Sequence, residues 1–449
     1  MRIDSALTNA ASGLDSINRQ LATIAQNVAN AGTPGYVRET LATSSVDAGG
    51  EGMGVRSGVA TRSVDAALQA NVRAASGDVA GGQLRQTALS GIDAASGAPG
   101  SGQDLASLLG ALRDGFSTLA SDPANQTQQR QVGTLAAGVA GGVNTLAQAV
   151  GAARQAAQDG LVDDVTTANT ALASVGRLSD QIVTARALGQ GTADLEDRRD
   201  TAATKVTQLT GARFLQQPNG DLLAVVGGTI LPTHASNGPL GIAVATLGPG
   251  STGPALTVSG VAAPVSGGTI GAAQELRDTV LPGLQASLDG FAQALAVGFG
   301  AVGLTLFTDG TGMVPPAGTP GFSGTIKVNP AVTVRPSMVR DGAAPAGAAG
   351  STTLINAALA VLLTGPGTVA GMATDLVANH AGLASQAAGT LATDQAVQSS
   401  LQAKLSAGTE VSVDSEMAHM LSLQNSYGAN AKVLAAVQAM WTQLLSSVP

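Results

Sequence analysis

The chain has 449 residues, which is long enough for two or three domains with cores of their own. Its net charge of -8 and its sequence pI of about 4.8 argue against electrostatic binding to nucleic acid or to an anionic membrane surface. The sequence contains no cysteine, and this excludes disulfides, thiolate metal sites and cysteine nucleophiles.

The first predicted element is a helix from about residue 4 to about residue 29. Its apolar residues recur at alternating steps of four and three, which places them on one seam of the helix, as in a coiled coil. The seam consists of Ile3, Leu7, Ala10, Leu14, Ile17, Leu21, Ile24 and Val28. Pro34 and Gly35 then suit the central positions of a type II turn, and residues 36–63 are expected to be extended.

Residues 64–211 are predicted to form a helical bundle, because long helical patterns are separated there by short Gly and Pro breaks. The predicted helices cover residues 64–95, 103–121, 124–159, 161–188 and 192–210.

The pattern changes at residue 212, and residues 212–350 are predicted to be a β-rich insert with one helix at 271–299. The insert opens with a strand, an Asn219-Gly220 turn and a second strand. Short β-like pieces follow, and residues 303–340 also have a β-like pattern. Residues 342–350 are rich in Gly, Ala and Pro and are predicted to be a linker.

Helical patterns return in residues 351–408, at 352–363 and 369–407, and residues 409–449 hold a terminal helix from Asp414. This helix carries a second seam of Met420, Leu423, Tyr427, Asn430, Leu434, Val437, Trp441, Leu444 and Val448. The fold class is therefore mainly α with a β-rich insert. We expect terminal coiled-coil helices, residues 1–63 as the N-terminal segment, an elongated helical bundle domain and a small β domain mid-chain.

A search for reaction chemistry finds no catalytic, cofactor or metal site. His234, His380 and His419 lack metal-ligand spacing and are expected to be ordinary surface or satisfied histidines. The Gly248–Gly253 segment matches G-x-G-x-x-G, but a strand-like run follows it where a dinucleotide site needs a helix. The acidic run at 194–200 is expected to be a salt-bridged helix surface, since Glu196 and Asp197 do not share a helix face. We expect no cofactor and no enzyme activity.

The N-terminal region has no unbroken apolar run of the kind that a secretory signal requires. No stretch is expected to have the length of a transmembrane helix, so membrane insertion is not predicted. The remaining signal is the pair of seams. The two terminal helices either pair within one chain, or they pack against the helices of neighbouring copies.

Several segments resemble the axial proteins of the bacterial flagellum, the rod, hook and hook-associated group. At the N-terminus these are Ser12-Gly13-Leu14 and the run from Asn27 to Tyr36, and at the C-terminus the runs 413–417 and 429–434. The segment Val37–Thr40 most resembles hook-associated protein 1, the FlgK family. Internal stretches at 194–200, 209–211, 267–271 and 276–284 are similar to passages of the same family. The long helical stretch 64–211 separates the chain from hook proteins, whose exposed domains are β-rich.

This resemblance implies a structural junction protein between hook and filament, secreted through the flagellar export apparatus and extracellular. Its implied partners are a ring of its own copies, the hook protein, hook-associated protein 3 on the filament side, and an export chaperone that binds the C-terminal region. Alternatives are another axial protein, of the hook or distal rod, or an enzyme domain carried on an axial scaffold. The implied assembly interface consists of Leu7, Leu14, Ile17, Leu21, Ile24, Asn27, Val28, Asn30, Tyr36, Leu423, Tyr427, Asn430, Leu434, Val437, Trp441 and Leu444.

Overall fold

The computed structural model describes residues 3–33, 35–48, 51–98, 100–235, 237–263, 265–343, 347–363, 365 and 367–446. The fold is mainly α-helical with small antiparallel sheets, which confirms the predicted fold class. Two compact units are built from non-consecutive stretches of the chain. The first contains Met1–Ser76, Thr167–Pro239 and Ala396–Pro449, and the second contains Gly77–Thr166 and Leu240–Gln395.

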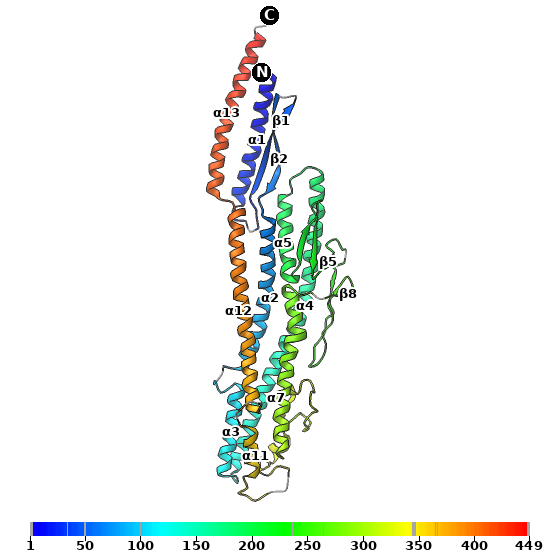
Figure 1. Cartoon of the computed structure of the whole chain (residues 1–449), viewed down its shortest axis with the longest axis vertical. Helices are drawn as coiled ribbons and strands as arrows, with labels where there is room; N and C mark the ends of the chain where they lie inside the picture. Colours follow the sequence, from blue (N-terminus) through cyan, green and yellow to red (C-terminus); the bar gives the residue numbers. More distant parts are fainter. Residues whose placement is uncertain are drawn as a thin grey trace. The chain divides into compact units, whose positions relative to one another are not determined.

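The elements are named in chain order in Figure 1. The helices are α1 (Ile3–Asn30), α2 (Ala66–Ser96), α3 (Leu105–Ser121), α4 (Gln126–Ala187), α5 (Ala193–Thr210), α6 (Gly268–Glu275), the π-helix η1 (Leu276–Val280), α7 (Leu281–Ala301), α8 (Phe322–Thr325), α9 (Pro330–Val334), α10 (Met338–Asp341), α11 (Thr353–Val361), α12 (Val369–Thr409) and α13 (Val413–Ser446). The strands are β1 (Glu39–Ala48), β2 (Glu51–Arg62), β3 (Arg213–Gln216), β4 (Leu222–Val226), β5 (Thr229–Leu231), β6 (Leu240–Gly241), β7 (Thr257–Val258), β8 (Val261–Ala262), β9 (Phe307–Thr308) and β10 (Lys327–Val328).

In the first unit, α1 lies between α13 and the hairpin of β1 and β2 (Figure 1). The predicted turn after α1 is present, because the Tyr36 N–H donates to the Thr33 carbonyl at 3.2 Å and Gly35 has a φ of +83°. The segment predicted only to be extended is this hairpin, in which Glu39 pairs with Arg62.

The first unit also contains α5 and a three-stranded sheet with the strand order β3-β4-β5. Gly211 ends α5 in the left-handed conformation, and its N–H donates to the Thr207 carbonyl at 2.7 Å. The predicted strand, turn and strand at the start of the insert are confirmed as β3 and β4.

In the second unit, three buried aromatic rings connect α3, α7 and β9. The ring centroids of Phe116 and Phe299 are 6.0 Å apart, and those of Phe299 and Phe307 are 5.5 Å apart. α6, η1 and α7 form one continuous helix, longer than the predicted 271–299. Its π-helical turn ends two residues before Pro282, which has no N–H for a bond to the Asp278 carbonyl, so the helix widens there.

The prediction is wrong in two parts of the chain. The helices predicted at 124–159 and 161–188 are one helix, α4, which continues through Gly160. Residues 303–340, predicted to be β-like, hold only the two-residue strands β9 and β10 among the described residues, with the short helices α8, α9 and α10 between and after them. In that stretch the Asn329 side chain accepts from the Ala331 N–H, so Asn329-Pro330 starts a helix where a strand was expected.

The predicted consecutive segments also differ from the two compact units, because α2, α4 and α12 each contribute residues to both units. Residues 344–346 of the predicted linker lie outside the described residues.

Contrary to expectation, α4 is long and apolar enough to span a membrane by length and composition alone. Ala and Val are frequent in this helix, and they raise its mean hydropathy without an unbroken run of large apolar side chains. A core helix of a soluble protein passes the same criterion, and α4 also carries the buried polar residues Arg154 and Gln158.

Candidate assembly interface

The helices at the two ends of the chain pack against each other. Ile17 and Ile24 of α1 and Leu423 of α13 form a buried apolar cluster. Partly buried side chains that pack against this cluster are Leu21, Val28 and Met420. The two predicted seams therefore pack against each other within one chain, which is one of the two alternatives that the sequence left open.

Each seam consists of two lines of side chains, and within a line the residues are seven positions apart. In the paired helices one line of each seam is buried, and the other line is partly exposed. In α1 the buried line, with a step of seven residues, is Ala10, Ile17 and Ile24, whereas Leu7 of the other line is 39% exposed. In α13, Leu423 and Val437 are buried, whereas Tyr427 is 40% and Trp441 is 45% exposed. Leu14 and Leu434 are half-buried. The side chains of Ile3 and Leu444 and all of Val448 lie outside the described residues.

Two glycines allow α1 to approach its neighbours closely. A Cβ at Gly13 would lie 3.2 Å from Nδ2 of Asn430, which explains why Asn430 faces α1 from within the second seam. On the hairpin side, Gly54 has a φ of +111°, and a Cβ there would collide with the Ser12 hydroxyl. The same hydroxyl accepts from the Val55 N–H at 3.1 Å.

Asn27 holds the chain where it turns from α1 into the hairpin, and its side chain is almost fully buried. Its Nδ2 donates to the Glu39 carbonyl at 2.9 Å, and its Oδ1 accepts from the Glu39 N–H at 2.9 Å. The Tyr36 hydroxyl donates to the same Oδ1 at 2.8 Å. Burial raises the pKa of Tyr36, and the nearby carboxylates of Glu39, Asp197 and Glu416 raise it further. The phenol therefore remains a donor at neutral pH.

Arg38, which lies between this turn and β1, connects the end of α12 to the start of α13. The Arg38 N–H donates to the Thr409 carbonyl at the end of α12, at 3.1 Å. Its guanidinium Nε donates to Glu416 Oε1 in the first turn of α13, at 2.6 Å. Because the side chain of Glu416 is only 1% exposed, this ion pair is shielded from solvent on its acidic side.

A second group of charges joins the end of β2 to α5. The Arg62 guanidinium lies 2.8 Å from Asp197 Oδ1, 2.6 Å from Asp200 Oδ2 and 3.5 Å from Glu196 Oε2. Asp200 also accepts from Gln69 at 2.9 Å and from Arg73 at 3.1 Å. These carboxylates were expected on a helix surface. They are largely buried instead, and Arg62 reaches both Glu196 and Asp197 because a guanidinium spans more than one helix position.

Burial is the main cause that raises the pKa of Asp197, to about 6, against the opposing effect of Arg62. The carboxylates of Asp200 and Glu39 add to the increase. A carboxyl whose folded pKa exceeds its ordinary value of 3.8 contributes stability below pH 3.8. That contribution is lost as the pH rises through about 6.

The structure brings most of the predicted interface residues together and leaves some apart. Asn30 bonds only within its own turn, to the Gln26 carbonyl and Thr33, among the interactions described. Leu7, Tyr427 and Trp441 are exposed and do not belong to the buried cluster. The sequence reasoning missed the roles of Arg62, Asp197, Asp200 and Glu416, because no spacing rule relates charges more than a hundred residues apart.

The histidine prediction is wrong for His380, which is buried and, within the described part of the chain, has a hydrogen-bond partner at only one of its two ring nitrogens. Its Nδ1 lies 3.1 Å from the Ser96 hydroxyl, while Nε2 has no hydrogen-bond partner among the described residues. Burial lowers its pKa, and Asp93 opposes that effect. The described residues contain no group of three or more His, Cys, Asp or Glu side chains that could hold a metal ion.

The Gly248–Gly253 segment binds the side chain of Arg154 through its backbone carbonyls. Arg154 donates to the carbonyls of Gly248, at 3.0 Å, and of Ser251. The loop therefore presents carbonyl oxygens inward, whereas a phosphate loop presents N–H groups. Strand β7 follows it, which agrees with the rejection of a dinucleotide site.

Comparisons with known proteins place the chain among flagellar proteins. A family model described as the flagellar hook-associated protein FlgK helical domain matches residues 89–309. A second model, described as the flagellar basal body rod FlgEFG protein C-terminal, matches residues 406–447, which include α13. A search of curated proteins finds no match.

Among solved structures, the chain is similar to the flagellar hook junction protein FlgK from Burkholderia pseudomallei. The two are 23% identical with a TM-score of 0.44, and the match covers 54% of this chain and 45% of that chain. The chain thus matches less than half the length of that protein. The helical-domain and C-terminal models match separate parts of one sequence, and together they support a hook-associated protein of the FlgK family.

Proposed function

We propose that the chain is a structural junction protein that joins the flagellar hook to the filament. The match of residues 89–309 to the FlgK helical domain supports this role, and one observation on the structure supports the assembly mechanism. After the two helices have paired, one line of each seam stays partly open, with Leu7 exposed on α1 and Tyr427 and Trp441 exposed on α13. An apolar line that remains exposed on a pair of terminal helices is typical of an assembly surface.

In this proposal, neighbouring copies bury the open lines when they assemble into a ring around the axial tube. The open side chains that neighbours would cover are Leu7, Tyr427 and Trp441, together with Met417, Val433, Met440 and Leu445 on the other faces of α13. Burial of apolar area contributes about 25 cal/mol per Å², so a row of such side chains repeated around a ring stabilises the tube.

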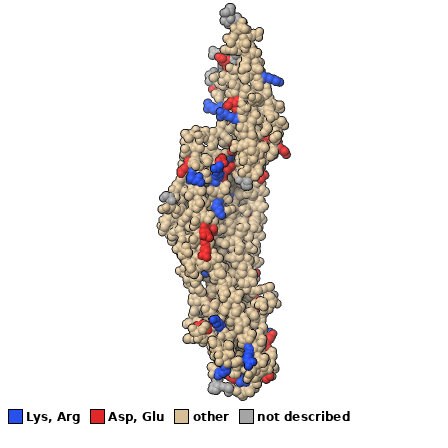
Figure 2. Space-filling view, turned by 180° about the vertical axis from the view of Figure 1, so that it is seen from behind, with Lys and Arg blue, Asp and Glu red and all other residues tan. Residues whose placement is uncertain are grey.

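The proposed partners are other copies of the chain, the hook protein on one side and hook-associated protein 3 on the filament side. An export chaperone is proposed to bind the C-terminal region before assembly. The chain would pass through the flagellar export apparatus and act outside the cell without a catalytic step. Figure 2 shows few charged side chains on the face it presents.

A different axial protein, of the hook or distal rod, is the second candidate. The match of residues 406–447 to the C-terminal model of rod proteins favours it, but the match of residues 89–309 to the FlgK helical domain favours the junction role.

Deletion of the gene discriminates between these candidates. Loss of a junction protein should leave hooks without filaments and release flagellin into the medium, as electron microscopy and immunoblotting of culture supernatants would show. Cells that also lack hooks would assign the chain to the hook or rod, and normal filaments would refute both roles.

A further inference from the structure

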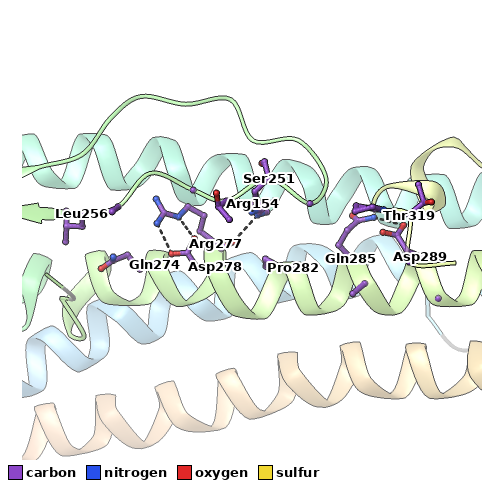
Figure 3. A pocket seen from close by; sticks show the side chains of 18 of the residues that line it. Arg154, Ser251, Leu256, Gln274, Arg277, Asp278, Pro282, Gln285, Asp289 and Thr319 are labelled. Carbon is purple, nitrogen blue, oxygen red and sulfur yellow. Dashed lines mark hydrogen bonds and ion pairs between the residues drawn. The ribbon is translucent and has the colours of Figure 1, made fainter. Parts of the chain in front are cut away.

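The second unit contains a preformed cavity that the junction role does not use. Its volume is about 920 Å³, which is within the range of small-molecule sites. One face of the continuous helix from α6 to α7 forms its floor, and loops near residues 250–256 and 317–320 lie over it (Figure 3). The floor carries a polar stripe at helical spacing, consisting of Gln274, Asp278, Gln285, Asp289 and Gln293.

The loops that cover the floor are held in place by close contacts. Gly250 and Gly321 both have positive φ, and a Cβ at Gly250 would lie 2.8 Å from Pro320. Reciprocally, a Cβ at Gly321 would lie 2.8 Å from Pro249. Two Pro-Gly dipeptides therefore stack against each other, which fixes the walls before any ligand enters.

The cavity presents hydrogen-bond acceptors, because the protein itself uses most of the donors. The Gln285 amide N–H donates to Asp289 at 3.1 Å and to Ser323 at 2.7 Å, which orients its carbonyl oxygen as a free acceptor. The Gln293 amide N–H donates to the Pro315 carbonyl at 3.2 Å with the same result. No described interaction of this chain uses the Oε1 atom of either side chain.

The acidic and basic groups of the cavity are also engaged. Arg277 holds Asp278 in a bidentate pair of 2.7 Å contacts, yet Asp278 remains 42% exposed (Figure 3). The Asp278 carboxylate thus retains lone pairs on the cavity side. Arg154 donates to the Arg277 carbonyl at 2.9 Å and to the two loop carbonyls described above. The Thr319 hydroxyl donates to the Pro316 carbonyl at 2.7 Å and keeps only its capacity to accept.

These properties define the ligand that fits. The lining contains the cations Arg154 and Arg277 and the anions Asp278 and Asp289, so its formal charge is balanced. A cationic ligand would find no unpaired anion among the described lining residues, because Arg277 already neutralises Asp278 and Asp289 accepts from Gly321 and Ser323. An anionic ligand would meet acceptors in place of donors. A neutral ligand with several hydroxyl donors satisfies the stripe, and each neutral hydrogen bond adds about 1 kcal/mol.

We propose that this cavity binds a neutral, hydroxyl-rich ligand of the saccharide class. The site belongs to the second unit, so its binding does not rest on the junction role. The direct test is isothermal titration of the purified full chain with three probes: maltotriose, the anionic trigalacturonic acid and the cationic spermidine. Saturable binding of maltotriose that exceeds both charged probes is expected. Failure of maltotriose to bind, or tighter binding of either charged probe, would overturn the proposal.

Two variants locate the binding at this cavity. Ala286→Trp fills the cavity from an exposed position of α7 and should weaken maltotriose binding by about tenfold or more. Its matched control is Ala152→Trp, an equally exposed alanine of α4 that does not line the cavity. Gln293→Leu removes one free acceptor, and Gln131→Leu on the exposed face of α4 is its control.

Thermal unfolding monitored by circular dichroism should show that all four variants fold. Equal loss of binding in a cavity variant and its control would contradict the proposed site, as would unchanged binding in Ala286→Trp.

Discussion

The side chain of Asn27 takes the place of a strand at the start of the hairpin. Its amide exchanges two hydrogen bonds with the backbone of Glu39, as a neighbouring strand would, and the Tyr36 hydroxyl completes the set. The turn that contains Gly35 brings these groups within reach. A short sequence motif thus sets the direction in which the chain leaves α1.

Asn27→Ala should lower the free energy of unfolding by about 2 to 4 kcal/mol, because the buried N–H and carbonyl of Glu39 would lose their partners. The control Asn30→Ala removes a bond to the Gln26 carbonyl on an exposed face and should cost less than about 1 kcal/mol. Urea unfolding of both variants checks the difference. Equal costs would show that Asn27 does not organise the turn.

Asp200 is expected to matter more than the neighbouring Asp197. Asp200→Asn weakens bonds to Arg62, Gln69 and Arg73 and should cost about 3 kcal/mol at pH 7.5. Asp197→Asn should cost less, because burial already raises the pKa of Asp197 and disfavours its charged form. Asp194→Asn changes an exposed pair with Arg198 and is the matched control, expected within about 0.5 kcal/mol. A larger loss for Asp197→Asn than for Asp200→Asn would contradict this order.

His380 should make the second unit sensitive to acid. Its folded pKa lies below the ordinary value of 6.5, so its contribution to stability is present above pH 6.5 and is lost as the pH falls below that value. Protonation would place an unpaired N–H and a positive charge in a buried site next to Asp93.

Unfolding free energies measured between pH 7.5 and pH 5 should therefore fall less steeply in His380→Leu than in the unmodified chain. His419→Gln, on an exposed part of α13, is the control and should keep the original slope. Parallel slopes for His380→Leu and the unmodified chain would show that His380 does not titrate in this range.

At the scale of elements, α1 and α13 are expected to open together because they share one small buried cluster. Ile24→Ala should destabilise the pair by about 2 to 3 kcal/mol and accelerate amide hydrogen exchange in both helices. Leu421→Ala, an exposed position of α13, should change neither helix. Faster exchange confined to α1 in the Ile24 variant would show that the two helices are independent.

The elements that the sequence predicted well are those with strong local signals. The terminal helices follow from the 3.5-residue step of their seams, and β3 and β4 follow from a turn between alternating strands. Prediction failed where local signals were ambiguous. Gly160 looked like a helix break, and the Val and Thr residues around β9 and β10 looked like strands. Gly160 is tolerated within the long helix α4, and the Asn329-Pro330 cap starts a helix where the Val and Thr residues favoured a strand.

At the scale of the whole molecule, assembly should change the surroundings of the open seam lines. The chain has a single tryptophan, Trp441, and this residue lies on the open line of α13. Its fluorescence emission should therefore shift to shorter wavelength when the purified chain assembles onto purified hooks, since burial moves the indole out of water. The chain in buffer alone serves as the control. An unchanged emission in hook-bound protein would place Trp441 outside the interface.

The sequence by itself determined the helical class of the chain, the seams of its terminal helices, the turn from Asn27 to Tyr36 and the resemblance to flagellar axial proteins. These features depend on spacing within about thirty residues, which a linear pattern records. Only the tertiary structure decided which line of each seam is buried and which remains open. It also revealed the pairs of Arg38 with Glu416 and of Arg62 with Asp200, which lie 378 and 138 residues apart in sequence. A periodic pattern identifies the apolar face of a helix, but the partner of that face is set by long-range contacts that the pattern does not contain.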